Sequence, residues 1–259
     1  MRIAVAGGTG LFGSQVVAKG IERGYRMLPI SRDSGHNLTA AGAQARLKSA
    51  IYGADAVIDV TRSPSSNERE ATVFFEAAGT NLANATASVG VERTVVLSLI
   101  GADSADGPDA DPRLDSYDGY LRAKGRQERA AVSRGHGVHV VRAAQSHNFV
   151  GQVLSRSQNE AQAVVDDLVV QPVEVSLVVD VLLDVAAAQR HDALLEVAGP
   201  SRERLVALAK EFAAYYFDET KIVARVASRR LASGILLPRE RAIVGGASFR
   251  DWLHQHARN

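Results

Sequence analysis

The sequence of 259 residues contains no cysteine, which excludes disulfide bonds, thiolate metal sites and cysteine nucleophiles together. It also lacks an excess of charge of either sign, because 30 basic and 29 acidic residues leave a formal net charge of +1. There is no run of like charges and no basic stripe, so we expect no nucleic acid partner. No apolar stretch approaches the roughly 18 residues that a membrane-spanning helix needs.

These absences predict a soluble, cytoplasmic protein with no membrane partner. The first residues form a charged, strand-like segment and not a signal peptide. Hydrophobic residues make up 46% of the chain, which suits one globular domain or one domain with a smaller lobe. The sequence does not decide between a monomer and a homodimer.

The seven histidines do not form a metal-binding pattern. His136 and His139 are three residues apart but flank a turn and the entry to a strand, and His254 and His256 would point to different sides of a helix. The aspartate-rich segment 102–119 lacks the residue order of a calcium-binding loop. We predict no metal site and interpret this segment as a loop beside the functional site.

Buried apolar strands alternate with helical segments in the first half of the chain. This alternation predicts an α/β fold with a doubly wound, Rossmann-like parallel sheet. No convincing strand lies between Asp33 and Gly53, so we expect one βα unit to be degenerate. Strands are predicted at 2–7, 26–31, 54–61, 93–101 and 138–144, and helices at 11–24, 68–90 and 119–135.

The pattern changes after Phe149, which predicts a core of residues 1–150 and a small C-terminal substrate lobe of residues 151–259, interleaved with the end of the sheet. A further helix is expected to begin at Ser201 as its N-cap, with Glu203 in the first turn. Trp252 is expected to anchor the last helix in the core. Short strands are predicted within 164–176 and at 194–199, and a helix at 177–189.

The chain begins RIAVAGGTGLFGSQVV, in which Gly7, Gly10 and Gly13 follow an apolar strand and open a helix. A dinucleotide-binding fingerprint requires this context. One glycine makes the tight turn, one lets the backbone approach a pyrophosphate, and Gly13 lets helix and strand pack closely. The helix N-terminus offers free N–H groups and a partial positive charge to the phosphates. We therefore predict that residues 1–150 bind NAD(P), in preference to a plain strand-to-helix turn.

The end of the second strand indicates which dinucleotide binds. An NAD site usually carries an Asp or Glu there, which binds the ribose hydroxyls and would repel a 2′-phosphate. Here the strand ends in Ser31 and Arg32, a hydroxyl and a guanidinium that would hold a phosphate through charge-assisted hydrogen bonds. We predict a preference for NADP(H), with NAD(H) as the alternative because Asp33 follows directly.

Tyr120 and Lys124 stand four residues apart in a predicted helix, so their side chains share one face. An ammonium group near a phenol favours the phenolate and lowers the pKa of the tyrosine. Such a tyrosine can donate a proton to a carbonyl oxygen as a hydride arrives. An exposed helix face is the alternative interpretation of this arginine-rich segment.

The order of GGTGLFG, the strand-end Ser98 in VVLSLIGAD, and YLRAK resembles the short-chain dehydrogenase/reductase superfamily in its atypical NmrA-like branch. The resemblance covers nearly the whole chain and includes ADAVIDVT, TNLANA, VVRAAQSHNF and LLPRERAIVGGASFRDWL. It implies an NADPH-dependent reductase, and the small and aliphatic residues after Phe149 suggest a small, apolar carbonyl or quinone-like substrate.

The resemblance also implies the roles of individual residues. Tyr120 would donate the proton, Lys124 would bind the nicotinamide ribose, and Ser98 would assist. The residues implied to contact the cofactor are Gly7, Thr9, Gly10, Leu11, Phe12, Gly13, Ser31, Arg32, Asn37, Leu38, Thr61, Arg62, Ser98, Lys124, Ala143, Ala144 and Gln145. The residues implied to begin the substrate pocket are Gln145, His147, Asn148 and Phe149.

One position departs from the superfamily. Active members usually carry a Ser or Thr near the end of the strand before the tyrosine helix, often two residues beyond Ser98, where this chain has Ile100. Two other functions therefore stay open: a catalytically silent NADP(H)-binding redox sensor that acts on a protein partner, and a nucleotide-sugar epimerase. Ser31 and Arg32 argue against the epimerase, since such enzymes generally keep NAD and a carboxylate there.

Overall fold

The computed structural model describes residues 1–105, 116–135, 137–157, 162–216 and 219–256. The chain forms two compact units. The first consists of Met1–Arg142 and Val179–Leu195, and the second of Ala143–Val178 and Glu196–Asn259. The chain therefore leaves the first unit after its fifth strand and returns to it for one helix. Part of the predicted loop 102–119, and His136, lie outside the described residues.

A seven-stranded sheet in the order β11-β8-β5-β4-β3-β1-β2 forms the centre of the fold. The pairs β1–β2, β1–β3, β3–β4 and β8–β11 are parallel, which confirms the predicted α/β class. As predicted, no strand lies between residues 31 and 55, but the helix Ala43–Ile51 lies there and connects the second strand to the third, so the expected degenerate βα unit is complete. The strands of the sheet are Arg2–Ala6 (β1), Arg26–Ile30 (β2), Ala56–Asp59 (β3), Arg93–Leu99 (β4), Val138–Ala143 (β5), Leu194–Ala198 (β8) and Ile243–Val244 (β11).

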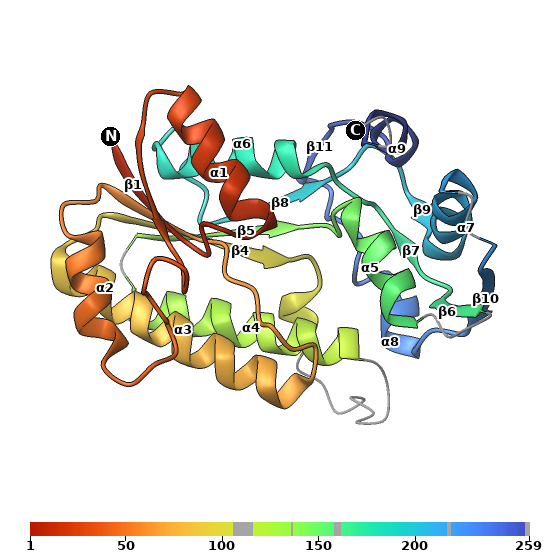
Figure 1. Cartoon of the computed structure of the whole chain (residues 1–259), viewed down its shortest axis with the longest axis horizontal. Helices are drawn as coiled ribbons and strands as arrows, with labels where there is room; N and C mark the ends of the chain where they lie inside the picture. The colour runs from red at the N-terminus through yellow and green to blue at the C-terminus, as the bar shows by residue number, and fades with distance from the viewer. Residues whose placement is uncertain (106–115, 136, 158–161, 217–218, 257–259) are drawn as a thin grey trace. The chain divides into compact units, whose positions relative to one another are not determined.

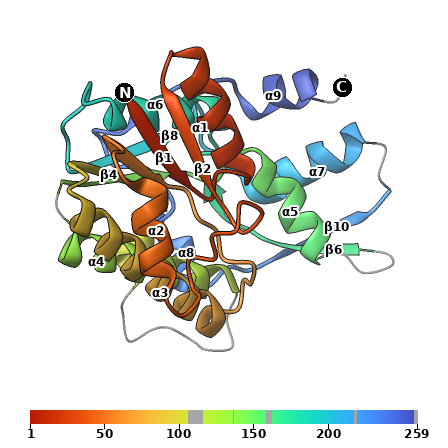
Figure 2. The ribbon, with the colours of Figure 1, turned by 60° about the vertical axis from the view of Figure 1, so that its left-hand side comes forward.

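Helices cover both faces of this sheet in the first unit. Figures 1 and 2 show α1 and α6 on one face, with α3 and α4 on the other. Burial on both faces explains why β1 and β3 are continuous apolar runs and do not alternate. The helices of this unit are Leu11–Glu22 (α1), Ala43–Ile51 (α2), Glu68–Val89 (α3), the short 3₁₀ helix Ala102–Ala105 (η1), Ser116–Arg134 (α4) and Val175–Ala186 (α6), whose first turn belongs to the second unit.

Helices α3 and α4 lie side by side, and their ends follow from local sequence signals. Asn67 caps α3 by accepting hydrogen bonds from the N–H groups of Arg69 and Glu70, and Gly90 ends it in the left-handed conformation. Arg122 of α4 binds Glu68 of α3 through two hydrogen bonds of 2.7 and 2.6 Å. This contact fixes the first half of α4, which carries Tyr120 and Lys124.

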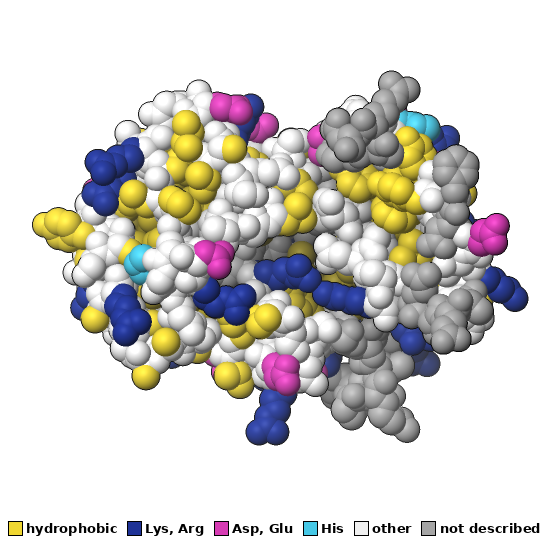
Figure 3. Space-filling model, in the orientation of Figure 1, with side chains coloured by type: hydrophobic (Ala, Val, Ile, Leu, Met, Phe, Trp, Pro, Cys, Tyr) yellow, Lys and Arg dark blue, Asp and Glu magenta, His cyan; other side chains and the backbone are white. Residues whose placement is uncertain are grey.

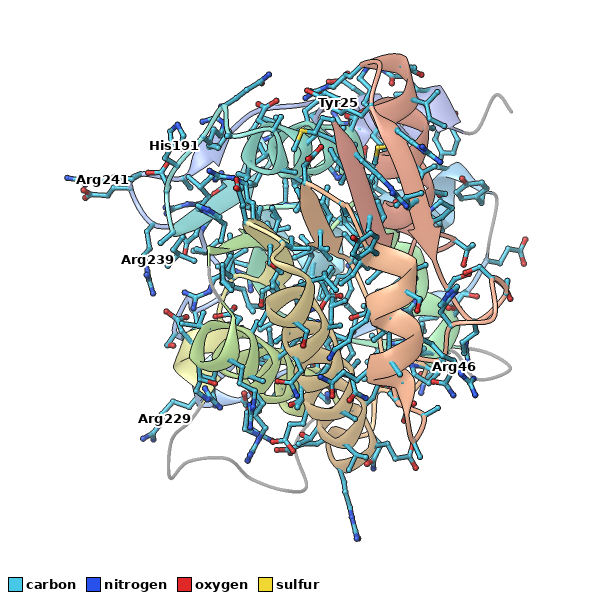
Figure 4. The ribbon with its side chains drawn as sticks, turned by 90° about the vertical axis from the view of Figure 1, so that its left-hand side faces the viewer. Tyr25, Arg46, His191, Arg229, Arg239 and Arg241 are labelled. Carbon is cyan, nitrogen blue, oxygen red and sulfur yellow. The ribbon has the colours of Figure 1, made fainter. Side chains whose placement is uncertain are left out.

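Helix α2 was not predicted. It packs Leu47 and Ile51 into the core beneath the sheet, whereas Arg46 on its outer side points away from the fold in Figure 4. Its N-cap, Gly42, makes no side-chain capping bond, and no acidic residue lies in the first turn. The usual start signals of a helix are therefore missing from its sequence.

The second unit contains two small sheets and several helices. One prediction in this region is wrong: residues 203–204 form a strand, and the next helix begins at Leu205 with Arg204 as its N-cap. Ser201 therefore does not cap it, because the chain first pairs Glu203 with Val170. The elements are Asn148–Ser157 (α5), Gln162–Asp166 (β6), Val169–Val170 (β7), Glu203–Arg204 (β9), Leu205–Tyr215 (α7), Lys221–Arg225 (β10), Arg229–Ala232 (α8) and Phe249–His256 (α9).

The surface carries charged side chains of both signs, and the described helices fall short of the length or the hydropathy of a membrane span. Basic, acidic and hydrophobic side chains are interspersed on the face drawn in Figure 3, as expected from the near-zero net charge. Within the described part of the chain, no helix is both long and apolar enough to cross a membrane.

Candidate cofactor and active site

The glycine-rich turn between β1 and α1 is closely packed against its neighbours. Gly7 has a φ of +82°, and a Cβ there would lie 2.9 Å from the carbonyl oxygen of Val60. A Cβ at Gly8 would lie 2.7 Å from the side chain of Pro29, and one at Gly13 would overlap the carbonyl oxygen of Gly7. These three positions need glycine for folding alone.

Gly10 is different, because its φ of −79° suits any residue. A Cβ at Gly10 would meet only the Gly7 carbonyl oxygen, at 3.4 Å. It is the N-cap of α1, makes no side-chain capping bond, and is followed by a first turn without an acidic residue. The N–H groups of that turn have no partners within the helix, so this exposed glycine leaves room for an anion beside them.

The loop after β2 contains the residues that were predicted to read the adenosine phosphate. The Ser31 hydroxyl is buried and accepts a 3.3 Å hydrogen bond from the Ser34 N–H, while the Ser31 N–H donates to the Ser34 hydroxyl at 2.9 Å. Arg32 is exposed. Thr9 Oγ1 of the glycine turn donates to the Asp33 carboxylate at 3.3 Å, so this acidic group lies against the turn.

The next predicted cofactor residues, Asn37 and Leu38, follow this loop in the first unit. Asn37 is exposed and accepts hydrogen bonds from the N–H and hydroxyl of Thr39. Leu38 is buried in the core, and its carbonyl accepts a 2.8 Å hydrogen bond from Asn81. A side-chain contact from Leu38 to an adenine is therefore less favoured than one from Asn37.

The end of β3 carries a buried acidic group that sequence reasoning missed. Asp59 is buried and accepts the Thr61 N–H at 2.9 Å, which turns the chain toward the exposed Arg62. Asp59 also accepts a 2.8 Å hydrogen bond from the side-chain amide of Gln127 on α4. The same amide nitrogen lies 3.1 Å from the Thr61 hydroxyl.

Lys124 is fully buried and its ammonium is held by two acceptors. It donates to the Leu97 carbonyl of β4 at 2.7 Å and to Gln127 Oε1 at 2.6 Å. Its charge also lies 4.7 Å from the ring centre of Phe75 on α3. Burial lowers the pKa of Lys124 to about 8, although the carboxylates of Asp59 and Glu128 act in the opposite direction.

Tyr120 lies one turn before Lys124 and packs against the same phenylalanine. The rings of Tyr120 and Phe75 meet edge to face, with their centres 5.6 Å apart. Ser98, next to the carbonyl that anchors Lys124, is completely buried, and its hydroxyl has no hydrogen-bond partner among the described residues. Ile100 is also buried. Tyr120 and Lys124 thus share a contact with Phe75, and Lys124 is anchored at the residue before Ser98.

The remaining predicted residues belong to the second unit. The Ala144 N–H donates to the Val197 carbonyl at 2.8 Å, and the carbonyl of the buried Gln145 accepts the Val173 N–H at 2.9 Å. Ala143, directly before them, is the last residue of β5 and is also buried. The backbone of this segment is therefore fixed.

His147 is part of an aromatic group in the second unit. Its ring is buried, lies within 6 Å of the rings of Phe249 and Trp252, and places Nε2 3.0 Å from the Ala247 carbonyl oxygen. Trp252 is buried as predicted and anchors α9. Asn148 and Phe149 begin α5 and are half-buried, so they are more accessible to a substrate than His147.

The comparison with known families identifies the first part of the chain. A family model described as NAD(P)H-binding matches residues 7–148, more than half of the sequence. The chain belongs to this NAD(P)H-binding family. The match begins at the first glycine of the turn and includes Asp59, Ser98, Tyr120 and Lys124. No curated protein matches the sequence.

Solved structures share the fold of this family member over nearly its whole length. A dTDP-4-dehydrorhamnose reductase from Clostridium acetobutylicum has a TM-score of 0.68 and 17% identity, with 97% of this chain and 92% of that chain covered. The Bacillus anthracis dTDP-4-dehydrorhamnose reductase in complex with NADP has a TM-score of 0.66 and 15% identity, at 97% and 92% coverage. A short-chain dehydrogenase/reductase superfamily protein from Agrobacterium tumefaciens with bound NAD has a TM-score of 0.67 and 15% identity. The match covers 100% of this chain and 96% of that chain.

These comparisons confirm an NAD(P)H-binding chain with a Rossmann-like fold, and the short-chain dehydrogenase/reductase superfamily stays a prediction. The NmrA-like branch is compatible with them and stays a prediction, as do the roles of the individual site residues. Among the described residues, no three His, Asp or Glu side chains are grouped so that they could hold a metal ion.

Proposed function

We propose that this protein is an NADPH-dependent oxidoreductase that reduces a small, apolar carbonyl or quinone-like compound. The observation that carries the proposal is the buried Lys124 ammonium, held at the Leu97 carbonyl near the carboxyl end of β4. In open α/β sheets, ligands bind outside the carboxyl ends of the strands. A buried cation is costly, and the next residue of the strand, Ser98, has a buried hydroxyl without a partner among the described residues. Both features favour a functional role over a structural one.

The first unit has the groups needed to hold the cofactor. The first turn of α1 and the space at Gly10 would receive the pyrophosphate. Because the Ser31 hydroxyl is engaged within its loop, Arg32 is the group that would bind a 2′-phosphate, while Asp33 would oppose it. NADPH preference therefore depends on the balance between these two neighbouring charges.

The proposed chemistry divides between cofactor and protein. The chemistry that a nicotinamide cofactor supplies is hydride transfer. Tyr120 would donate a proton to the substrate oxygen, and Lys124 would hold the ribose and favour the phenolate that Tyr120 becomes. Ser98 would orient the substrate oxygen.

A second candidate, a silent NADP(H)-binding sensor, is favoured by one observation. Ile100 stands where active relatives usually have a hydroxyl, and the Ser98 side chain is completely buried. A hydroxyl without access to substrate cannot polarise a carbonyl group. Cofactor binding without turnover would follow.

Titration of the purified protein with NADPH and NADH, followed by fluorescence, tests the cofactor assignment. The same samples are then mixed with a panel of carbonyl and quinone compounds, and NADPH oxidation is recorded. We expect tighter binding of NADPH than of NADH and oxidation with at least one compound. Binding without turnover would favour the sensor, and preferential NADH binding would contradict the role of Arg32.

Tyr120→Phe tests the proton donor. We expect turnover to fall by roughly 100-fold or more, because the proton source is lost, while NADPH affinity changes little. Tyr52→Phe, at an exposed position, serves as the matched control. Equal turnover in Tyr120→Phe and wild type would remove Tyr120 from the mechanism.

A further inference from the structure

We propose that Gln127 and Asp59 are positioning residues for Lys124: Gln127 fixes the ammonium group in place, and Asp59 supplies its counter-charge through the Gln127 amide. This inference rests on the proposed function, because it concerns the lysine that would hold the cofactor. It adds two residues that neither the glycine turn nor the Tyr120–Lys124 pair indicates.

A continuous chain of hydrogen bonds connects the three side chains. Lys124 Nζ donates to Gln127 Oε1 at 2.6 Å, and Gln127 Nε2 donates to Asp59 Oδ2 at 2.8 Å. All three residues are buried. Only one orientation of the amide satisfies both neighbours, since its oxygen must face a donor and its nitrogen must face an acceptor. Glutamate or an aliphatic residue at 127 would fail at one or both contacts.

Of the two carboxylates that act on Lys124, Asp59 is the one that is not already paired with another cation among the described residues. Asp59 of β3 and Glu128 of α4 are the carboxylates that act on the ammonium. Glu128 binds Arg142 of β5 at 3.0 and 2.6 Å, and Arg142 also pairs with Asp103 at 2.7 Å. Asp59 forms no ion pair with any described residue. On α3, the neighbour of Lys124 is the uncharged Phe75.

Polar groups surround the carboxylate of Asp59. Besides the bonds from Thr61 and Gln127, Asp59 lines a small cavity together with Thr86 and Thr94. The Thr94 hydroxyl is buried without a partner among the described residues. The carboxylate thus has polar groups on two sides, which reduces the cost of its burial.

These hydrogen bonds fix the position of the Lys124 ammonium group. Two of its three N–H groups are bound to Leu97 and Gln127, so the third has a fixed direction. Without Gln127, the flexible four-carbon side chain would lose one anchor and Asp59 would lose a donor. Without the charge of Asp59, the ammonium would lose its proton more readily.

Titration of Lys124 in the free protein tests the inference directly. The chain has five lysines, at positions 19, 48, 124, 210 and 221, so protein labelled with ¹³C at the lysine side chains gives few signals. Lys124→Met identifies the signal of Lys124. We expect a midpoint near pH 8 in the wild type. In Asp59→Asn the midpoint should fall by roughly half a pH unit or more, because the group that raises the pKa is gone.

NADPH binding provides the functional measurement. The affinity of Asp59→Asn should decline at lower pH than that of the wild type, with a difference of roughly threefold near the midpoint. Gln127→Met, which keeps the side-chain volume, should weaken NADPH binding and also lower the midpoint. Asp180→Asn is the control, because its carboxylate binds Arg23 at 2.7 Å and takes no part in the chain of bonds.

Unchanged Lys124 midpoints in folded Asp59→Asn and Gln127→Met would overturn the inference, even if both variants were less stable. Should Gln127→Met fail to fold, Asp59→Asn decides by itself, since it retains the size and an oxygen acceptor for the Thr61 N–H. Failure of the proposed function is seen separately, as absence of NADPH binding to the wild type.

Discussion

At the scale of single residues, the glycines of the turn between β1 and α1 differ in whether the fold itself requires them. Gly7, Gly8 and Gly13 would each place a Cβ against backbone or a proline side chain. Gly10 has ordinary dihedral angles and open space. Nothing in its dihedral angles or its neighbours requires glycine at position 10, so we expect a bound molecule that approaches the backbone to be the reason for it.

Two alanine substitutions test this difference. Gly10→Ala should keep the free energy of unfolding within about 1 kcal/mol of the wild type and weaken NADPH binding roughly 10-fold or more. Gly13→Ala should lower the free energy of unfolding by more than about 2 kcal/mol, because helix and turn must separate. Urea unfolding and fluorescence titration measure the two effects. Normal NADPH affinity in Gly10→Ala would argue against a pyrophosphate at this turn.

At the scale of elements, the strands and long helices were predictable because their signals are local. The strands β1 and β3 are short, mostly apolar runs, and α3 carries both its cap and its terminal glycine. Helix α2 lacks such signals, and the start of α7 was misplaced because pairing of Glu203 with Val170 depends on a strand more than 30 positions away. The contact between Asp59 and Gln127 spans 68 positions, so no local pattern could reveal it.

A buried ion cluster joins three elements next to the candidate site. Arg142 at the end of β5 binds Glu128 of α4 and pairs with Asp103 of η1. Burial opposes the charge of Arg142, but its hydrogen bond to Glu128 and the nearby carboxylates raise its pKa overall. The cluster holds α4 and the segment after β4 against β5, and thereby supports Ser98 and Lys124.

Removal of Arg142 should therefore destabilise the protein and disturb the site. We expect Arg142→Met to lower the free energy of unfolding by about 3 kcal/mol, because the buried Glu128 carboxylate loses its partner. Arg126→Met, on α4, is the control, since the pair of Arg126 with Glu76 is half-exposed and should contribute less than about 1 kcal/mol. Denaturant unfolding of both variants measures the difference. Equal small losses would mean that the buried cluster contributes no more than a surface pair.

At the scale of the whole molecule, the chain completes its first unit only after a long excursion. Residues 179–195 return to it and contribute most of α6 and the beginning of β8. Arg23 of α1 binds Asp180 and Asp184 of α6 at 2.7 and 2.8 Å, and the Val140 N–H of β5 donates to Ala193. Val179, Leu182 and Leu183 of α6 are buried. The first unit therefore includes residues beyond the predicted boundary at 150, and we expect its stability to depend on them.

Two fragments test this dependence. A fragment of residues 1–150 would expose the surface that α6 covers and leave β5 as an open sheet edge, which favours aggregation. We expect it to melt without a cooperative transition, whereas residues 1–199, which retain α6 and β8, should melt cooperatively and gain thermal stability from NADPH. At 100 times the dissociation constant, bound NADPH would add about 2.7 kcal/mol to the free energy of unfolding. A cooperative, NADPH-stabilised fragment 1–150 would show instead that the first five strands and their helices form a self-sufficient cofactor-binding domain.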